Sequence, residues 1–147
     1  GWHIVLHVDG AALLAHAEAI DALECPVVID HMARLSADAG LAQPAFQCLL
    51  ELAAMPHVWV KISAGDRMVA GPDALTLAVP FMAALAGVAP TRTLWGTDWP
   101  HPNIRFMPDD GDMADLLAVA VPGAAARQAI LVDNPAALYQ FGLEPQP

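Results

Sequence analysis

The stretch TLWGTDWPHPN, residues 93–103, begins as a strand and continues as a rigid, proline-rich loop. Its first residues favour a strand, whereas Pro100 and Pro102 fix φ and cannot continue a sheet ladder. Asp98 is therefore expected at the carboxyl end of a strand. In α/β proteins, catalytic side chains gather at the carboxyl ends of parallel strands. The pattern makes Asp98 the strongest candidate for a functional residue.

Outward from this stretch, strand-like and helix-like segments alternate four times. We expect strands at residues 2–8, 26–30, 58–63 and 93–97, and helices at residues 11–23, 45–55, 73–86 and 113–121. Two short helices follow at residues 124–132 and 135–141, the second with Asn134 as its cap and Pro135 in its first turn. The alternation predicts an α/β fold with a parallel sheet covered by helices.

Four βα units fit two architectures. One is half of a (β/α)8 TIM-type barrel, which usually takes about 250 residues, and the other is a small open, doubly wound sheet. The segment HVDGA, residues 7–11, stands where a nucleotide-binding sheet would carry its glycine-rich fingerprint, which weakens that version. At 147 residues, the chain is expected to be a single domain, 1–147.

The amino-acid composition limits the classes of partner that the protein is expected to bind. The net charge of −10 argues against nucleic acid and against an anionic membrane surface, but a few arginines can still bind a small anion locally. The chain is 56% hydrophobic and starts without Met, so we expect a truncated start and a surface that packs on further chain. No signal peptide or membrane span is evident, and the isolated Cys25 and Cys48 predict a reducing, cytoplasmic setting.

Polar residues follow the expected strands. His7, His31 and Asp98 stand at three strand ends, and strand alternation places Asp30 on the opposite face from His31, in a structural role. A carboxylate at position 98 can take a proton from water, and an imidazole at position 31 can polarise a carbonyl or bind a metal. His3 lies deeper on the face of His7 and is interpreted as interior.

Cationic and loop residues near the same edge are candidates for substrate binding. Arg34 and Arg67 fall just after strand ends, where guanidinium forks suit carboxylates. Lys61 is interpreted as interior or as extending along the sheet toward water. His101 and Asn103 lie within reach of Asp98 in the following loop, and His7 completes the set of expected substrate contacts.

Four motifs together resemble the amidohydrolase superfamily, and within it the lactonase branch. They are VIDHM at 28–32, VKISAG at 60–65, LWGTDWPHPN at 94–103 and LVDNPAALY at 131–139. The resemblance implies the last four βα units of a (β/α)8 barrel. It also implies that Asp98 activates water, that His31 polarises a lactone carbonyl, and that Arg34 and Arg67 hold carboxylates of a substrate such as a pyrone dicarboxylate from aromatic catabolism.

Two other hypotheses stay open. The first is a hydrolase or decarboxylase of the amidohydrolase type that binds Zn²⁺ through His7, His31 and Asp98, since relatives differ in metal dependence. The second is a non-catalytic α/β fragment, because fold alone does not show activity. The unpaired sheet edges at 2–8 and 93–97 further predict self-association into a homo-oligomer.

Overall fold

The computed structural model describes residues 1–68, 74–102 and 107–141 of the chain. Its strands are β1 (Ile4–Leu6), β2 (Val27–Ile29), β3 (Val58–Lys61) and β4 (Thr93–Leu94). Its helices are α1 (Gly10–Asp21), α2 (Pro44–Ala54), α3 (Ala74–Val88), α4 (Asp110–Ala120), α5 (Ala124–Gln128) and α6 (Asn134–Tyr139). Single turns of helix lie at η1 (Asp30–Arg34), η2 (Ala37–Ala39), η3 (Gly65–Arg67) and the π-helical η4 (Ala129–Asp133).

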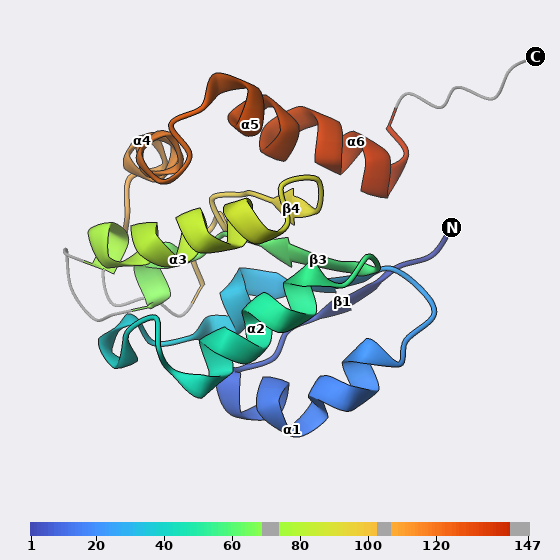
Figure 1. Cartoon of the computed structure of the whole chain (residues 1–147). Helices are drawn as coiled ribbons and strands as arrows, with labels where there is room; N and C mark the ends of the chain where they lie inside the picture. The colour runs from blue at the N-terminus through green and yellow to red at the C-terminus, as the bar shows by residue number, and fades with distance from the viewer. Residues whose placement is uncertain (69–73, 103–106, 142–147) are drawn as a thin grey trace, which may run out of the picture.

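The four strands form one parallel sheet in the order β1-β2-β3-β4 (Figure 1). The register pairs Ile29 with Val60, and Lys61 with Leu94. The predicted strand–helix alternation is confirmed, although each strand is shorter than expected. Every carboxyl end therefore lies at the same edge of the sheet.

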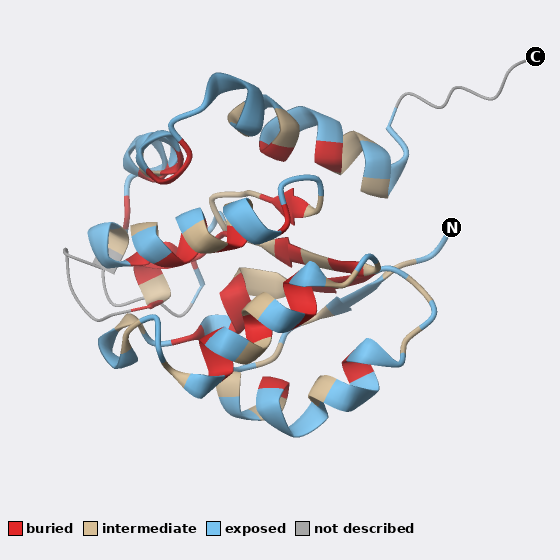
Figure 2. Ribbon diagram, viewed as in Figure 1, coloured by how far each residue is buried: buried red, intermediate tan, exposed pale blue. Residues whose placement is uncertain are grey.

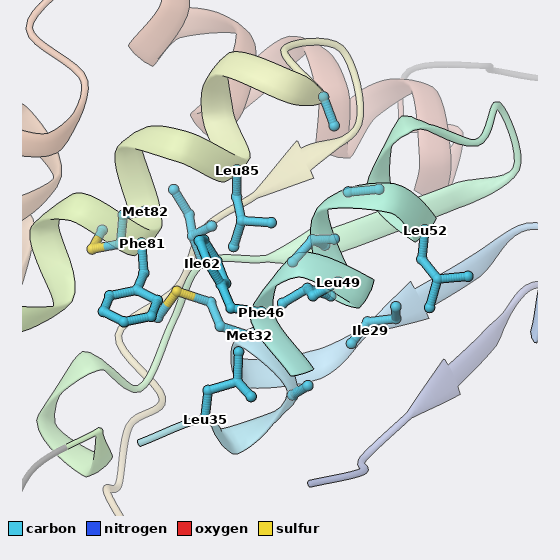
Figure 3. Close-up of a cluster of buried hydrophobic side chains, with 14 of the residues drawn as sticks. Ile29, Met32, Leu35, Phe46, Leu49, Leu52, Ile62, Phe81, Met82 and Leu85 are labelled. Carbon is cyan, nitrogen blue, oxygen red and sulfur yellow. The ribbon is translucent and has the colours of Figure 1, made fainter. Parts of the chain in front are cut away.

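The hydrophobic core fills the space between the sheet and the helices α1, α2 and α3 (Figures 1 and 2). Phe46 of α2 stacks edge-on against Phe81 of α3, with ring centroids 4.7 Å apart. Figure 3 shows these helices meeting Ile29 of β2 and Ile62 just after β3. Burial of this apolar area is the main stabilising contribution to the fold.

The sheet faces follow from the same core. Val27, Ile29, Val58 and Val60 belong to the helix-side cluster, so strand alternation places Lys61 on the opposite face. In β2 the same alternation places Asp30 with Lys61 on the face opposite the helices, whereas we expected Asp30 to lie away from the site.

One predicted helix start is wrong. Asn134 does not cap α6, because the π-helical turn η4 runs directly into that helix without a break. The Asn134 side chain is buried instead, and its Nδ2 donates to the carbonyls of Pro90 and Thr93 at 2.9 and 2.8 Å. These bonds attach α6 to the start of β4. By contrast, Asp9 caps α1 by accepting from the Ala12 N–H at 2.9 Å.

Within the described ranges, no helix combines the length and the apolar character needed to cross a membrane.

Candidate active site

The polar residues of the strand ends meet at the carboxyl edge of the sheet. Lys61 closes β3, and His31 and Asp98 follow β2 and β4. Because adjacent parallel strands are only about 5 Å apart, residues just beyond their ends can touch across the sheet. This edge is where the structure brings most of the predicted site residues together.

A left-handed turn places His31 in this cluster. The φ angles of His31, Met32, Ala33 and Arg34 are 50°, 49°, 54° and 49°, in a region that L-residues occupy at a cost of about 1–2 kcal/mol each. Met32 and Ala33 are fully buried beneath the turn, and that burial offsets the strain. The turn brings the His31 side chain to the same side as Asp30. If the chain had stayed extended, strand alternation would have placed the two side chains on opposite sides.

Both ring nitrogens of His31 have partners. Nδ1 lies 2.8 Å from the Ser63 hydroxyl oxygen. Nε2 lies 3.1 Å from an Asp30 oxygen and 3.5 Å from an Asp98 oxygen. The His31 side chain is only 11% exposed, so these contacts are largely shielded from water. The imidazole is therefore oriented by Ser63 on one side and by two carboxylates on the other.

Asp30 belongs to the cluster, contrary to the structural role that we expected. Its second oxygen lies 2.7 Å from Nζ of Lys61, the only lysine in the sequence. Burial alone raises the pKa of Asp30, but the hydrogen bonds and positive charge of His31 and Lys61 outweigh it and lower the pKa to about 2. Asp30 is thus an ionised carboxylate at any physiological pH. Sequence reasoning missed it because the left-handed turn cannot be inferred from non-glycine residues.

Asp98 holds the other side of the site. One of its oxygens pairs with the Arg67 guanidinium, and the other faces His31. Its φ of 68° is again left-handed, as the chain turns sharply out of β4. Arg67 thereby orients the candidate base. Its Nε is buried without a hydrogen-bond partner among the described residues, so the guanidinium retains donor capacity beyond Asp98.

His101 lies beneath the loop rather than at its surface. Its backbone N–H donates to the Asp98 carbonyl at 2.8 Å, and its ring Nε2 lies 3.1 Å from an oxygen of Asp110 at the start of α4. The ring is buried. This position supports a structural role more than the expected contact with substrate.

Asp66 was not singled out from the sequence, yet it is a buried carboxylate next to the site. Both of its oxygens are buried without a hydrogen-bond partner among the described residues. Burial raises the pKa of Asp66, against the opposing effects of its own backbone and of the nearby charges on Arg67 and His101. No sequence signal separates it from an ordinary turn aspartate.

The remaining predicted contacts lie at the margin. The exposed ring of His7 packs edge-on against His31, with centroids 5.5 Å apart. Arg34 is exposed at the end of η1 and makes no ion pair with the part of the chain that the structure describes. His3 instead packs on Tyr139, 5.4 Å away, at the other end of β1. Asn103 lies outside the described residues.

The charges at this edge do not form a ready metal site. Within residues 1–68, 74–102 and 107–141, no three His, Cys, Asp or Glu side chains are placed to hold an ion together. The two carboxylates that face His31 are each already paired with a cation, Lys61 or Arg67. A Zn²⁺ bound by His7, His31 and Asp98 would have to compete with Arg67, so these residues as arranged do not fit the ion.

Comparisons with known proteins agree with this architecture. The sequence profile of the Amidohydrolase family matches residues 1–141. The chain is 42% identical over 141 residues to a 4-sulfomuconolactone hydrolase from Rhizobium radiobacter, covering 94% of this chain and 47% of that protein. It is 38% identical over 149 residues to a 2-pyrone-4,6-dicarboxylate hydrolase from Comamonas testosteroni, covering 95% of this chain and 49% of that protein.

A solved structure matches as well. A protein from Pseudomonas putida, provisionally described as a 2-pyrone-4,6-dicarboxylic acid hydrolase, superposes with a TM-score of 0.85 at 35% identity. That match covers 98% of this chain and 54% of the other. The chain spans about half the length of the curated relatives that it matches. It therefore belongs to the amidohydrolase family, and its four parallel βα units are those of an amidohydrolase-type (β/α)8 barrel.

Proposed function

We propose that this chain supplies the water-activating half of an enzyme that hydrolyses a carboxylate-bearing lactone. The observation that carries the proposal is the pairing of Asp98 with His31 at the carboxyl edge of the sheet, with Arg67 on the far side of Asp98. A carboxylate base beside an imidazole donor is a suitable arrangement for adding water to an ester carbonyl.

The chemistry assigns one role to each side chain. Asp98 takes a proton from water as the water oxygen bonds to the lactone carbonyl carbon. The His31 N–H donates to the carbonyl oxygen and stabilises the negative charge that develops there. The carbonyl then re-forms, the ring C–O bond breaks, and the leaving oxygen takes the proton held by Asp98. The product is the ring-opened acid, with one water consumed.

Arginine suits the substrate class. A guanidinium binds carboxylate or sulfonate oxygens through paired, charge-assisted hydrogen bonds. Arg34 is exposed three residues after His31 in the chain, and the side chain of Arg67, which pairs with Asp98, is 18% exposed. The relatives named above are a hydrolase of a sulfonated lactone and a hydrolase of a pyrone dicarboxylate. Both of these substrates carry such anionic groups. We therefore propose that Arg34 and Arg67 select an anionic lactone of aromatic catabolism.

The proposal also includes a cellular location and a second candidate for the enzyme. The free thiols of Cys25 and Cys48 support a reducing, cytoplasmic location. A Zn²⁺-dependent hydrolase or decarboxylase is the second candidate: His7 approaches His31, but Asp98 is paired with Arg67, so such an ion would need ligands from the rest of a barrel. Because the rest of a barrel contributes further strand ends, metal content has to be measured on the full-length protein.

The test is a ring-opening assay with the full-length protein. Each turnover at neutral pH releases a proton, which titration at constant pH records. We expect turnover of 2-pyrone-4,6-dicarboxylate or 4-sulfomuconolactone and at least tenfold lower kcat/KM for an uncharged lactone of the same ring size. No ring opening of any of the three would contradict the proposal. Loss of activity on chelation, with recovery on adding Zn²⁺, would favour the second candidate.

A further inference from the structure

We infer that Asp30, held in place by Lys61, keeps a hydrogen on Nε2 of His31, so that His31 faces the site as a hydrogen-bond donor. Asp30 and Lys61 are thereby positioning residues that act through His31. The inference deepens the proposed function, on which its catalytic consequence rests, and it concerns two residues that the sequence analysis did not place in the site.

The first step is the chemistry of the groups around the ring. An ionised carboxylate has no hydrogen to give and can only accept. Nε2 of His31 faces two such groups, an Asp30 oxygen at 3.1 Å and an Asp98 oxygen at 3.5 Å. A bare Nε2 lone pair pointing at two carboxylates would be repelled by both. Nε2 must therefore carry hydrogen, whether the ring is neutral or charged.

The second step is the other ring nitrogen. The Ser63 hydroxyl, 2.8 Å from Nδ1, can donate to a bare nitrogen or accept from a protonated one. Ser63 thus fixes the plane of the ring without choosing its tautomer. The choice is made on the Nε2 side, where Asp30 is the nearer acceptor.

The third step is the role of Lys61. Its Nζ lies 2.7 Å from the Asp30 oxygen that does not face His31, and its side chain is 27% exposed. Such a partly shielded pair keeps Asp30 ionised and fixes the direction of its carboxylate plane. Lys61 also draws the negative charge of the carboxylate toward the oxygen that it contacts. The hydrogen bond from His31 Nε2 to the other Asp30 oxygen is weaker as a result. A lactone carbonyl can then compete for that hydrogen.

The ring state of His31 can be measured without any substrate. Long-range ¹H–¹⁵N spectra of histidine-labelled full-length protein at a fixed neutral pH separate hydrogen-bearing from bare ring nitrogens. The signals of His31 are identified by their loss in His31→Gln. We expect a hydrogen-bearing Nε2 in the wild type and a clear shift toward a bare Nε2 in Asp30→Asn. The same substitution at exposed Asp115 on α4 serves as the control and should change nothing.

Activity supplies the second readout. Lys61→Met should lower kcat for ring opening by about tenfold to a hundredfold, the worth of one charged hydrogen bond, with KM little changed. Lys61→Arg should restore most of the lost rate because it keeps the charge. The double variant Asp30→Asn/Lys61→Met should be no slower than Asp30→Asn alone, since the two residues act as a unit.

A bare Nε2 in the wild type, unchanged His31 nitrogens in Asp30→Asn, or additive losses in the double variant would each overturn the inference. If the full-length protein opens no lactone, the proposed function fails while the spectra still decide the state of His31. The failure of one is therefore distinguishable from the failure of the other.

Discussion

At the scale of single residues, the pKa values of two aspartates at the carboxyl edge of the sheet shift in opposite directions. Asp30 lies between His31 and Lys61, whose charges lower its pKa despite partial burial. Asp66 is buried with no hydrogen-bond partner among the described residues, and its pKa is raised by that burial. The two aspartates lie on different strand ends of one edge, so their environments, not their type, decide what each contributes.

These opposite shifts predict opposite effects of the same substitution. The folded pKa of Asp30 is about 2, below the ordinary value of 3.8, so its contribution to stability is present above pH 4 and is lost as the pH falls from 4 through 2. Asp30→Asn should therefore lower the free energy of unfolding at pH 7 by about 1–2 kcal/mol after allowance for solvent screening, and this cost should disappear below pH 2.

For Asp66 the raised pKa means that the charged form is disfavoured in the folded state. Asp66→Asn should raise the Tm at pH 7, and the gain should shrink as the pH falls through the raised pKa of Asp66, until none is left below 3.8. Thermal melts of both variants across this pH range test the pair. Parallel pH profiles for the two variants would show that the environments are not as described.

Sequence reasoning placed Asp98 and His31 at strand ends, and it missed the pair Asp30–Lys61 for a physical reason. Alternation along β2 separates Asp30 from His31 only if the chain stays extended. A left-handed run through Met32 and Ala33, both non-glycine residues, breaks that condition. Tertiary burial stabilises the run, and no local pattern predicts it.

At the scale of elements, predicted and observed segments agree in type and order and differ at their ends. The strand–helix alternation was enough to assign the four βα units, and α2 begins at Pro44, one residue before the expected start. Asn134 shows the limit of local signals. Its position before Pro135 is typical of a cap. In the fold, however, the carbonyls of Pro90 and Thr93 accept hydrogen bonds from its side-chain amide. Only tertiary contact decides between the two.

A pair of glycines tests how closely the elements pack. A Cβ on Gly65, in the turn η3 that carries Arg67, would lie 2.9 Å from the Cβ of Ala78 on α3. Neither group can swing away, so Gly65→Ala should destabilise by about 1–3 kcal/mol through overpacking. Gly87→Ala, on the same helix, meets nothing within 4 Å and should stabilise by up to about 1 kcal/mol. Urea unfolding of both variants gives the comparison, and equal effects would contradict the packing described.

At the scale of the whole molecule, the sheet formed by the described residues has two unpaired edge strands, and apolar side chains are exposed along one of them. The side chains of Ile4 and Val5 in the edge strand β1 are 37% and 49% exposed, and Trp2 beside them is almost fully exposed. Curated relatives are about twice as long, and a closed barrel pairs every strand edge. The site residues meet at one end of this sheet, where a barrel collects side chains from all of its strands.

The exposed edge predicts behaviour of the 147-residue chain on its own. We expect it to self-associate, because unpaired edge strands and apolar patches invite pairing with another copy. Val5→Lys should reduce the association by placing a charge on the edge. Light scattering after size exclusion measures both. A monodisperse wild-type monomer that melts cooperatively would contradict the prediction.

The central claim is that Asp98 activates water for lactone opening, and one comparison tests it most directly. In the full-length protein, kcat/KM for the lactone that it opens best is measured for the wild type, Asp98→Asn and the control Asp115→Asn. Circular dichroism confirms that each variant is folded. The account predicts that Asp98→Asn loses at least a hundredfold, as removal of a general base does, while Asp115→Asn keeps the wild-type rate. A folded Asp98→Asn with near-normal turnover would contradict it.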